Sequence, residues 1–151
     1  FACLRPRLMS NVRRHDTGSV PMPIYHQMLG KVPTETDRIR NYLANEDLGA
    51  KHCSAHENVL KPGAEVPAHQ HAVEEVIVCL EGEGECTFAN QPAAKYYAGS
   101  VIIIPPNTPH LLRNTGKSLL RQICFFAGNP TDTQWVQWEG SVADLGGNRA
   151  A

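Results

Sequence analysis

The sequence lacks the features that direct a chain to a membrane, to nucleic acid or into a disulfide framework. No apolar run approaches the roughly 18 residues of a membrane-spanning helix. Basic residues number 14 and acidic residues 15, and no Lys or Arg cluster predicts a nucleic-acid-binding face. We therefore expect neither a membrane nor a nucleic acid as partner. The 151 residues, 42% of them hydrophobic, are enough for one ordinary domain.

The cysteines show no pairing pattern, and no C-x-x-C pair occurs among them. The set is Cys3, Cys53, Cys79, Cys86 and Cys124. Such an odd, scattered set is typical of a reducing compartment, where isolated cysteines behave as small buried hydrophobes. The sequence also shows no charged head, apolar body and small-residue cleavage site of a secretory signal. We therefore expect a cytoplasmic protein.

The first part of the chain differs in character from the rest. Residues 1–8 precede a Met-Ser pair that reads like a natural start, and we expect them to be a leader or an upstream extension. Residues 9–38 open on a stretch rich in Pro, Arg and His, which is typical of an irregular N-terminal arm. Residues 34–43 fit either a helix capped by Thr34 or a strand with alternating side chains, and we favour the strand.

From residue 51 onward, short apolar or alternating runs are separated by Gly, Pro and Asn. These runs predict strands over residues 51–60, 75–80, 85–88, 101–104, 111–113 and 119–127. Many short strands at this spacing indicate a sandwich or barrel, and the lack of helix-length periodic runs between them argues against a βαβ fold. Residues 101–104 are apolar at every position, which predicts a strand covered on both faces.

Of the seven histidines, three stand in a pattern that suits a metal ion. His69 and His71 are two residues apart, so on a strand both side chains point to the same face. Glu75 follows after an interval long enough for the chain to turn back, and His110 follows a proline-rich turn. Three imidazoles and one carboxylate suit a divalent transition metal. The alternative is that these histidines lie on surface loops.

The same residues match the two motifs of the cupin family, interval by interval. The first motif is Gly, five residues, His-x-His, three or four residues, Glu, six residues, Gly, and it stands here as Gly63, His69, His71, Glu75 and Gly82. The second is Gly, five residues, Pro-x-Gly, two residues, His, three residues, Asn, and it stands here as Gly99, Pro105, Asn107, His110 and Asn114. Asn107 replaces the usual Gly, and Asn adopts left-handed conformations more readily than most residues. The sequence therefore resembles a small single-domain cupin, or monocupin.

The resemblance implies an all-β fold, namely a double-stranded antiparallel β-barrel of the jelly-roll type. We expect this barrel over residues 39–138 and a C-terminal tail over residues 139–151. The resemblance also implies a homodimer. One divalent transition metal per chain (iron, manganese, nickel or zinc) is expected inside the barrel, with the ligands His69, His71, Glu75 and His110.

Strand alternation predicts further side chains near the metal. Ile77 and Cys79 share the face of Glu75, and Leu112 shares the face of His110, so these three are expected to line a pocket. An earlier strand carries one polar face, made of His52, Ser54, His56 and Asn58. This face either lies inside the barrel, where it would bind substrate or support the metal ligands, or it faces solvent, and we favour solvent.

Two aromatic pairs complete the predicted picture. Of Tyr96 and Tyr97, we expect one to pack and one to be exposed, with no catalytic duty. We expect Trp135 and Trp138 to cap the core or a subunit interface rather than to form a binding site, because aromatic residues mainly supply buried area.

The family includes many activities, so the fold does not give the function. Our first hypothesis is an oxidoreductase, a metal-dependent dioxygenase that acts on an oxygenated organic small molecule, with Glu75 as metal ligand or general base. An apolar wall, made of Ile77, Ile102 or Ile103, Leu112, and Phe125 or Phe126, suits an aromatic or aliphatic substrate. The second hypothesis is a non-redox isomerase, cyclase or lyase in which the metal polarises a carbonyl. The third is a metal-dependent binding module without turnover.

Overall fold

The computed structural model describes residues 24–25, 35–89, 91–128 and 133–137, and most of these residues lie in strands. The elements are β1 (Arg38–Ala44), the short 3-10 helix η1 (Glu46–Leu48), β2 (Cys53–Leu60), β3 (Glu65–Gln70), β4 (Glu75–Glu81), β5 (Glu83–Phe88), β6 (Ala94–Tyr97), β7 (Val101–Ile104), β8 (His110–Asn114), β9 (Leu120–Ala127) and β10 (Gln134–Trp135). No α-helix occurs in this described part of the chain. The predicted all-β class is confirmed.

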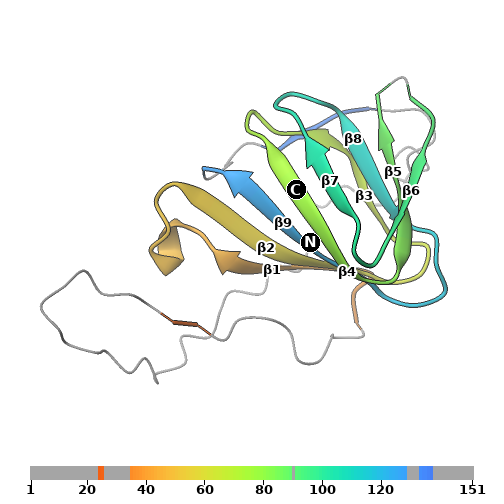
Figure 1. The fold of residues 1–151 in the computed structure, drawn as a ribbon, viewed down its shortest axis with the longest axis horizontal. Coiled ribbons are helices and arrows are strands. Elements are labelled where there is room, and N and C mark those ends of the chain that lie inside the picture. The colour runs from red at the N-terminus through yellow and green to blue at the C-terminus, as the bar shows by residue number, and fades with distance from the viewer. Residues whose placement is uncertain (1–23, 26–34, 90, 129–132, 138–151) are drawn as a thin grey trace, which may run out of the picture.

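The strands form two antiparallel sheets that pack against each other (Figure 1). One sheet has the order β1-β2-β9-β4-β7 and the other the order β10-β3-β8-β5-β6. From β7 to β10, successive strands alternate between the two sheets, as they do in a jelly-roll barrel. Sequence neighbours therefore face each other across the interior, and side chains from distant strands meet there.

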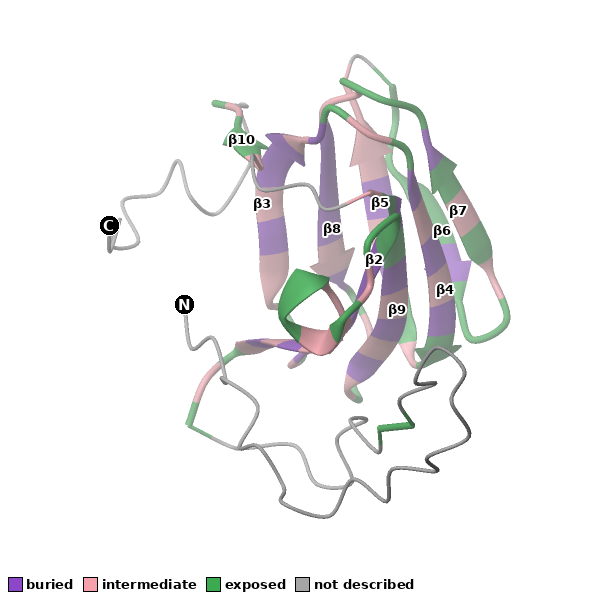
Figure 2. Cartoon of the chain, turned by 90° about the vertical axis from the view of Figure 1, so that its left-hand side faces the viewer, coloured by how far each residue is buried: buried purple, intermediate pink, exposed green. Residues whose placement is uncertain are grey.

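The space between the sheets is filled by side chains from both of them. Leu60, Ile77 and Leu120 of the first sheet and Val66 and Leu112 of the second are at most 2% exposed and belong to one cluster. Figure 2 shows the buried positions alternating with others along β4 and β9, as expected for strands with one inward face. Full burial of such side chains stabilises the fold by about 1.5–3 kcal/mol each.

One asparagine and one glycine of the motifs serve the fold rather than the chemistry. The Asn114 side-chain amide donates to the carbonyl oxygens of Leu60 at 2.9 Å and Ser118 at 2.8 Å. Gly82 has a φ of 84°, and a Cβ atom there would collide with the carbonyl oxygen of Leu119. The side chain of Asn114 and the absence of a side chain at Gly82 both hold loops together. These motif residues therefore set the frame in which the histidines are placed.

The predicted strands are confirmed with small shifts of their ends. The six runs expected from residue 51 onward correspond to β2, β4, β5, β7, β8 and β9. The strand favoured within residues 34–43 is β1, which runs from Arg38 to Ala44, while Thr34 lies outside the described residues. Strands β3, β6 and β10 are not among the predicted runs, because none of them carries a longer run of apolar residues.

The prediction that residues 101–104 are covered on both faces is wrong. β7 lies at the edge of its sheet, where β4 is its neighbour. Ile104 is 2% exposed, but Val101 is 58% and Ile103 61% exposed. An apolar run therefore indicated a strand correctly, but it does not say whether a second layer covers the outer face, since that depends on the place of the strand in the sheet.

The predicted boundaries of the arm, barrel and tail stay predictions. Residues 1–8 and 139–151, as well as Trp138, lie outside the described residues. Within the residues that are described, no helix has both the length and the apolar character needed to cross a membrane.

Candidate metal centre

The structure brings together the four residues that the sequence pattern singled out. His69 lies on β3, His71 directly after it, and Glu75 and His110 begin β4 and β8. His69 and His110 are cross-strand partners, so their rings lie side by side, with centroids 4.2 Å apart. One ligand atom from each of the four residues lies within 4.8 Å of the others, and all four residues are buried.

Hydrogen bonds to backbone carbonyls orient two of the imidazole rings. Nδ1 of His69 lies 2.7 Å from the carbonyl oxygen of Pro67, and Nδ1 of His110 lies 2.9 Å from that of Thr108. A carbonyl oxygen accepts, so each Nδ1 must carry the proton and donate it. The lone pair then sits on Nε2, which is the tautomer that a metal ligand needs. The hydroxyl oxygen of Thr133 lies 3.5 Å from Nδ1 of His71 and provides a weaker contact.

The Nε2 atoms converge on the carboxylate of Glu75. Oε2 of Glu75 lies 3.2 Å from Nε2 of His110 and 3.5 Å from Nε2 of His71. Oε2 of Glu75 and Nε2 of His110 are buried without a hydrogen-bond partner among the described residues. When neither atom carries a proton, two acceptors meet at this distance, and a cation between them would remove their repulsion.

The electrostatics of the cluster also favour a neutral imidazole at His69. Burial lowers the pKa of His69 well below 6.5, and the neighbouring His110 and His71 lower it further. A neutral imidazole is the form that binds a metal. Transition-metal bonds to His and Glu of about 2.0–2.2 Å would place neighbouring ligand atoms about 3.0–3.5 Å apart. The observed separations of 3.2 Å and 3.5 Å fit this requirement.

The site therefore suits one divalent transition metal ion, with three nitrogen ligands and one oxygen ligand. Imidazole and carboxylate ligands suit iron, manganese, nickel and zinc, and they do not select one of these metals.

The residues predicted to line a pocket all lie in the interior. Ile77, Cys79 and Leu112 are at most 2% exposed and belong to the central cluster. Ile77 and Cys79 follow Glu75 at every second position, on the same inner face of β4. The two choices left open by the sequence are also decided: Phe126 is buried and Phe125 is 44% exposed, while Ile102 packs against the core and Ile103 does not.

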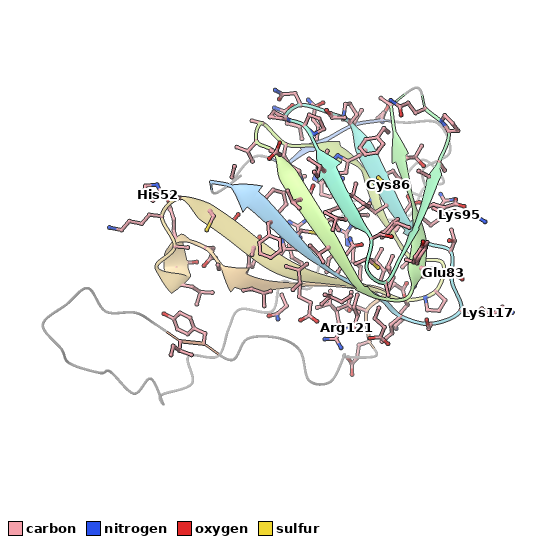
Figure 3. The ribbon with its side chains drawn as sticks, in the orientation of Figure 1. His52, Glu83, Cys86, Lys95, Lys117 and Arg121 are labelled. Carbon is pink, nitrogen blue, oxygen red and sulfur yellow. The ribbon has the colours of Figure 1, made fainter. Side chains whose placement is uncertain are left out.

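The expectation that the polar face of β2 meets solvent is wrong for three of its four residues. His52 is exposed, and its label in Figure 3 lies at the far tip of the sheet. Ser54, His56 and Asn58, in contrast, are at most 6% exposed. The reason is that this face of β2 is paired, position by position, with the inward face of β9, so a row of polar side chains points into the barrel.

His56 is linked to the candidate metal cluster through the ring of Phe126. Its ring lies 5.4 Å from that of Phe126, which in turn lies 4.9 Å from the ring of His71. Burial lowers the pKa of His56 well below 6.5, and the charge of Arg40 lowers it further. His56 is thus a neutral, buried imidazole in the second layer around the site.

Trp135 lies closer to the site than expected. It pairs with His69 across β10 and β3, and its ring lies 5.5 Å from the ring of His69. Because Trp135 is half exposed, it forms part of the wall next to the cluster rather than a cap of the central core. Strand β10 is only two residues long, so no local sequence pattern indicated this contact. Trp138 lies outside the described residues.

Tyr96 is buried and Tyr97 is 67% exposed, as predicted. The hydroxyl of Tyr96 donates to Oε1 of Gln122 at 2.8 Å.

The buried thiols behave as ordinary core groups. Burial raises the pKa of Cys86 to about 12, with a contribution from Glu75. Burial also raises the pKa of Cys79 and Cys124. These thiols are therefore protonated and unreactive at neutral pH.

Together, the fold and the site define a double-stranded antiparallel barrel with a buried three-histidine, one-carboxylate cluster. Residues 57–126 match the family model described as the cupin domain. The chain belongs to the cupin family.

Two curated relatives and one solved structure illustrate the likeness. Auxin-binding protein 1 of Arabidopsis thaliana is 36% identical over 77 residues, which cover 46% of this chain and 39% of that protein. The uncharacterised protein MJ1618 of Methanocaldococcus jannaschii is 30% identical over 106 residues, which cover 62% of this chain and 83% of that protein. An uncharacterised protein of Klebsiella pneumoniae with a double-stranded β-helix domain has a TM-score of 0.63 at 18% identity, over 71% of this chain and 90% of that one.

Proposed function

We propose that this chain is a metal-dependent enzyme that acts on a small oxygenated organic molecule, in the first place as a dioxygenase. The observation that supports this proposal best is the convergence of unpartnered acceptor atoms from Glu75 and His110 in a buried cluster. Four protein ligands leave two positions of a six-coordinate metal for substrate and dioxygen. When bound, the metal would supply these open positions together with redox or Lewis-acid chemistry.

The side chains of the chain itself have distinct parts in this proposal. The carbonyl oxygens of Pro67 and Thr108 hold the ring tautomers of His69 and His110. Glu75 binds the metal or accepts a proton from a substrate hydroxyl, since Oε2 is buried and has no hydrogen-bond donor among the described residues. Apolar side chains such as Ile77 and Phe126 exclude water from the reacting atoms and suit an aromatic or aliphatic substrate.

The test measures metal content and oxygen uptake on the same samples. Protein loaded separately with iron(II), manganese, nickel and zinc is offered diketones, flavonols and catechol-like compounds in air and under argon. We expect wild type and His52→Ala to bind about one metal ion per chain and His69→Ala to lose it. His52 is the matched control because it is an exposed histidine on the same protein.

The possible outcomes of this test distinguish the three hypotheses. Substrate-dependent oxygen uptake by wild type, absent in His69→Ala, supports the dioxygenase. Turnover that continues under argon supports the non-redox isomerase, cyclase or lyase instead. The similarity to a protein named for auxin binding favours a third candidate, a metal-dependent binding module. That role is supported if a small molecule binds to the metal-loaded protein and is recovered unchanged under both atmospheres.

A further inference from the structure

Arg40 is a basic residue on the inward face of β1. It is the cross-strand partner of Asn58 on β2, and the same row continues to Gln122 on β9 and Cys79 on β4. Cross-strand partners share a face of the sheet, and Asn58, Gln122 and Cys79 are all buried. Arg40 itself is partly exposed. Its position at the edge of the sheet therefore lets its side chain reach both the interior and solvent.

The guanidinium of Arg40 makes no hydrogen bond or ion pair with any residue that the structure describes. The nearby Arg38 differs in this respect, because its Nη1 donates to the carbonyl oxygen of Glu65 on β3 at 3.4 Å. Arg113 and Arg121 are paired with the carboxylates of Glu65 and Glu57. A guanidinium with five donors and no acceptor is expected to meet an anion from outside the described residues.

The charge of Arg40 acts on the interior of the barrel. After burial, it is the largest cause of the lowered pKa of His56. His56 lies on the inward face of β2, where its cross-strand partner is Tyr42, two positions after Arg40 on β1. Arg40 therefore lies on the face of β1 that is turned toward the interior.

The same row contains two further polar atoms without partners. Oδ1 of Asn58 and Nε2 of Gln122 are buried and have no hydrogen bond within the described residues, although the two residues are only 3% and 0% exposed. One of these atoms accepts and the other donates. Leaving both unsatisfied would cost about 1–3 kcal/mol each, so a polar group of a ligand, or a water, is expected between them.

Charge balance favours an anion in the same place. With a divalent ion, three neutral imidazoles and the carboxylate of Glu75, the metal cluster carries one positive charge, and Arg40 adds another. The other buried carboxylates, Glu57 and Glu65, are already paired with Arg121 and Arg113. These carboxylates therefore do not balance the charge of Arg40 or that of a metal-loaded cluster, and a bound anion would do so.

We propose that Arg40 binds the carboxylate of a small organic acid, whose remaining polar group meets Asn58 and Gln122. This inference rests on the proposed function, since it names the substrate class of the same site. The planar guanidinium can hold a carboxylate with two parallel hydrogen bonds, a geometry that it offers to a phosphate as well. The described residues, however, include no α-helix whose N-terminus would bind a phosphate.

The geometry limits the size of this acid. Successive inward-facing residues of a strand are two positions, or about 7 Å, apart, and each belongs to a separate row across the sheet. Glu75 and Arg40 stand two rows apart, with the row of His56 and Ile77 between them. Strands β1 and β4 are also three positions apart in the order of the sheet, so the acid must span the part of this separation that the arginine side chain does not cover.

The test compares carboxylates with their neutral amides on metal-loaded protein. The probes are 2-hydroxybenzoate with 2-hydroxybenzamide, and 2-oxobutanoate with 2-oxobutanamide, measured by calorimetry and by thermal shift. Wild type is compared with Arg40→Gln, Arg40→Lys and the control Lys95→Gln. Lys95 is exposed on β6, where its side chain projects away from the barrel (Figure 3), and its substitution changes the net charge in the same way.

We expect at least one carboxylate to bind wild type and Lys95→Gln at least about tenfold more tightly than its amide. In Arg40→Gln this preference is lost, and in Arg40→Lys it is reduced because the two-pronged geometry is gone. The inference is overturned if no carboxylate binds, if the amides bind equally well, or if a folded Arg40→Gln keeps the preference.

Metal content, measured on every sample, separates this result from the test of the proposed function. A wild type that binds no metal contradicts the proposed function. Carboxylate binding that depends on Arg40 in such metal-free protein would still support the anion site. If metal-loaded wild type and metal-loaded Arg40→Gln bind the carboxylates equally well, only the anion site is contradicted.

Discussion

The backbone amide of Asn107 donates to the carbonyl oxygen of His71 at 2.6 Å. This hydrogen bond joins the turn of the second motif directly to a candidate metal ligand of the first. Asn107 has a φ of 57°, and it is the one non-glycine residue with a positive φ in the described part of the chain. The left-handed conformation expected where Asn replaces the family's Gly is therefore present, and the turn is kept.

This contact predicts different effects for two substitutions of Asn107. Asn107→Gly should leave stability and metal content unchanged, since Gly adopts a positive φ at no steric cost. Asn107→Val should lower the free energy of unfolding by about 1–3 kcal/mol, because a branched side chain is strained there. Urea unfolding and metal analysis of both variants check this. A valine variant as stable as wild type would show that the turn does not depend on this conformation.

Removal of the metal should destabilise the protein. A ligand that binds the folded state alone contributes about 4 kcal/mol when its concentration is a thousand times its dissociation constant. We expect a chelator to lower the melting temperature of wild type and of His52→Ala, with recovery when the metal is added back. His110→Ala should melt at the same temperature with and without chelator. Equal melting of chelated and metal-loaded wild type would argue that the cluster is not a metal site.

The metal-free protein should lose stability in mild acid. Burial holds the pKa of His56 and His69 well below 6.5 in the folded state, whereas the unfolded chain takes up protons near that value. The unfolded state therefore binds more protons as the pH falls through 6.5, and stability falls with it, by at most about 1.4 kcal/mol per pH unit for each group.

Urea unfolding of the chelated protein between about pH 8 and pH 5 measures this loss. His56→Gln should flatten the dependence, whereas His52→Gln should not, because His52 is exposed. A stability that stays constant or rises toward acid would contradict the prediction.

The homodimer expected from the family resemblance stays a prediction, and the structure suggests where to test it. Val101 and Ile103 on the edge strand β7 are 58% and 61% exposed, and Phe125 on β9 of the same sheet is 44% exposed. An apolar outer face that ends in an unprotected edge strand favours pairing with a second copy. Light scattering should give twice the chain mass for wild type and a lower mass for Ile103→Lys. A monomeric wild type would exclude the dimer.

Local sequence determined the strands and the ligand set. Apolar runs bounded by Gly, Pro and Asn indicate strands without reference to the rest of the chain, and the interval between His69 and His71 places both side chains on one face. Only a divalent transition metal fits three imidazoles and a carboxylate well. The four residues that the structure gathers could be named beforehand because the two cupin motifs mark them, while strand alternation placed Ile77 and Cys79 on the inner face.

The tertiary structure alone decided which faces are covered. The polar row of Ser54, His56 and Asn58 looks like a solvent face, yet it is buried because β2 pairs with β9 and turns this row inward. The apolar residue Ile103 looks like core, yet it is exposed because β7 ends its sheet. Alternation tells which side chains share a face, but the layer that covers this face comes from strands distant in sequence. The contacts of Trp135 with His69 and the inward direction of Arg40 depend on such strands in the same way.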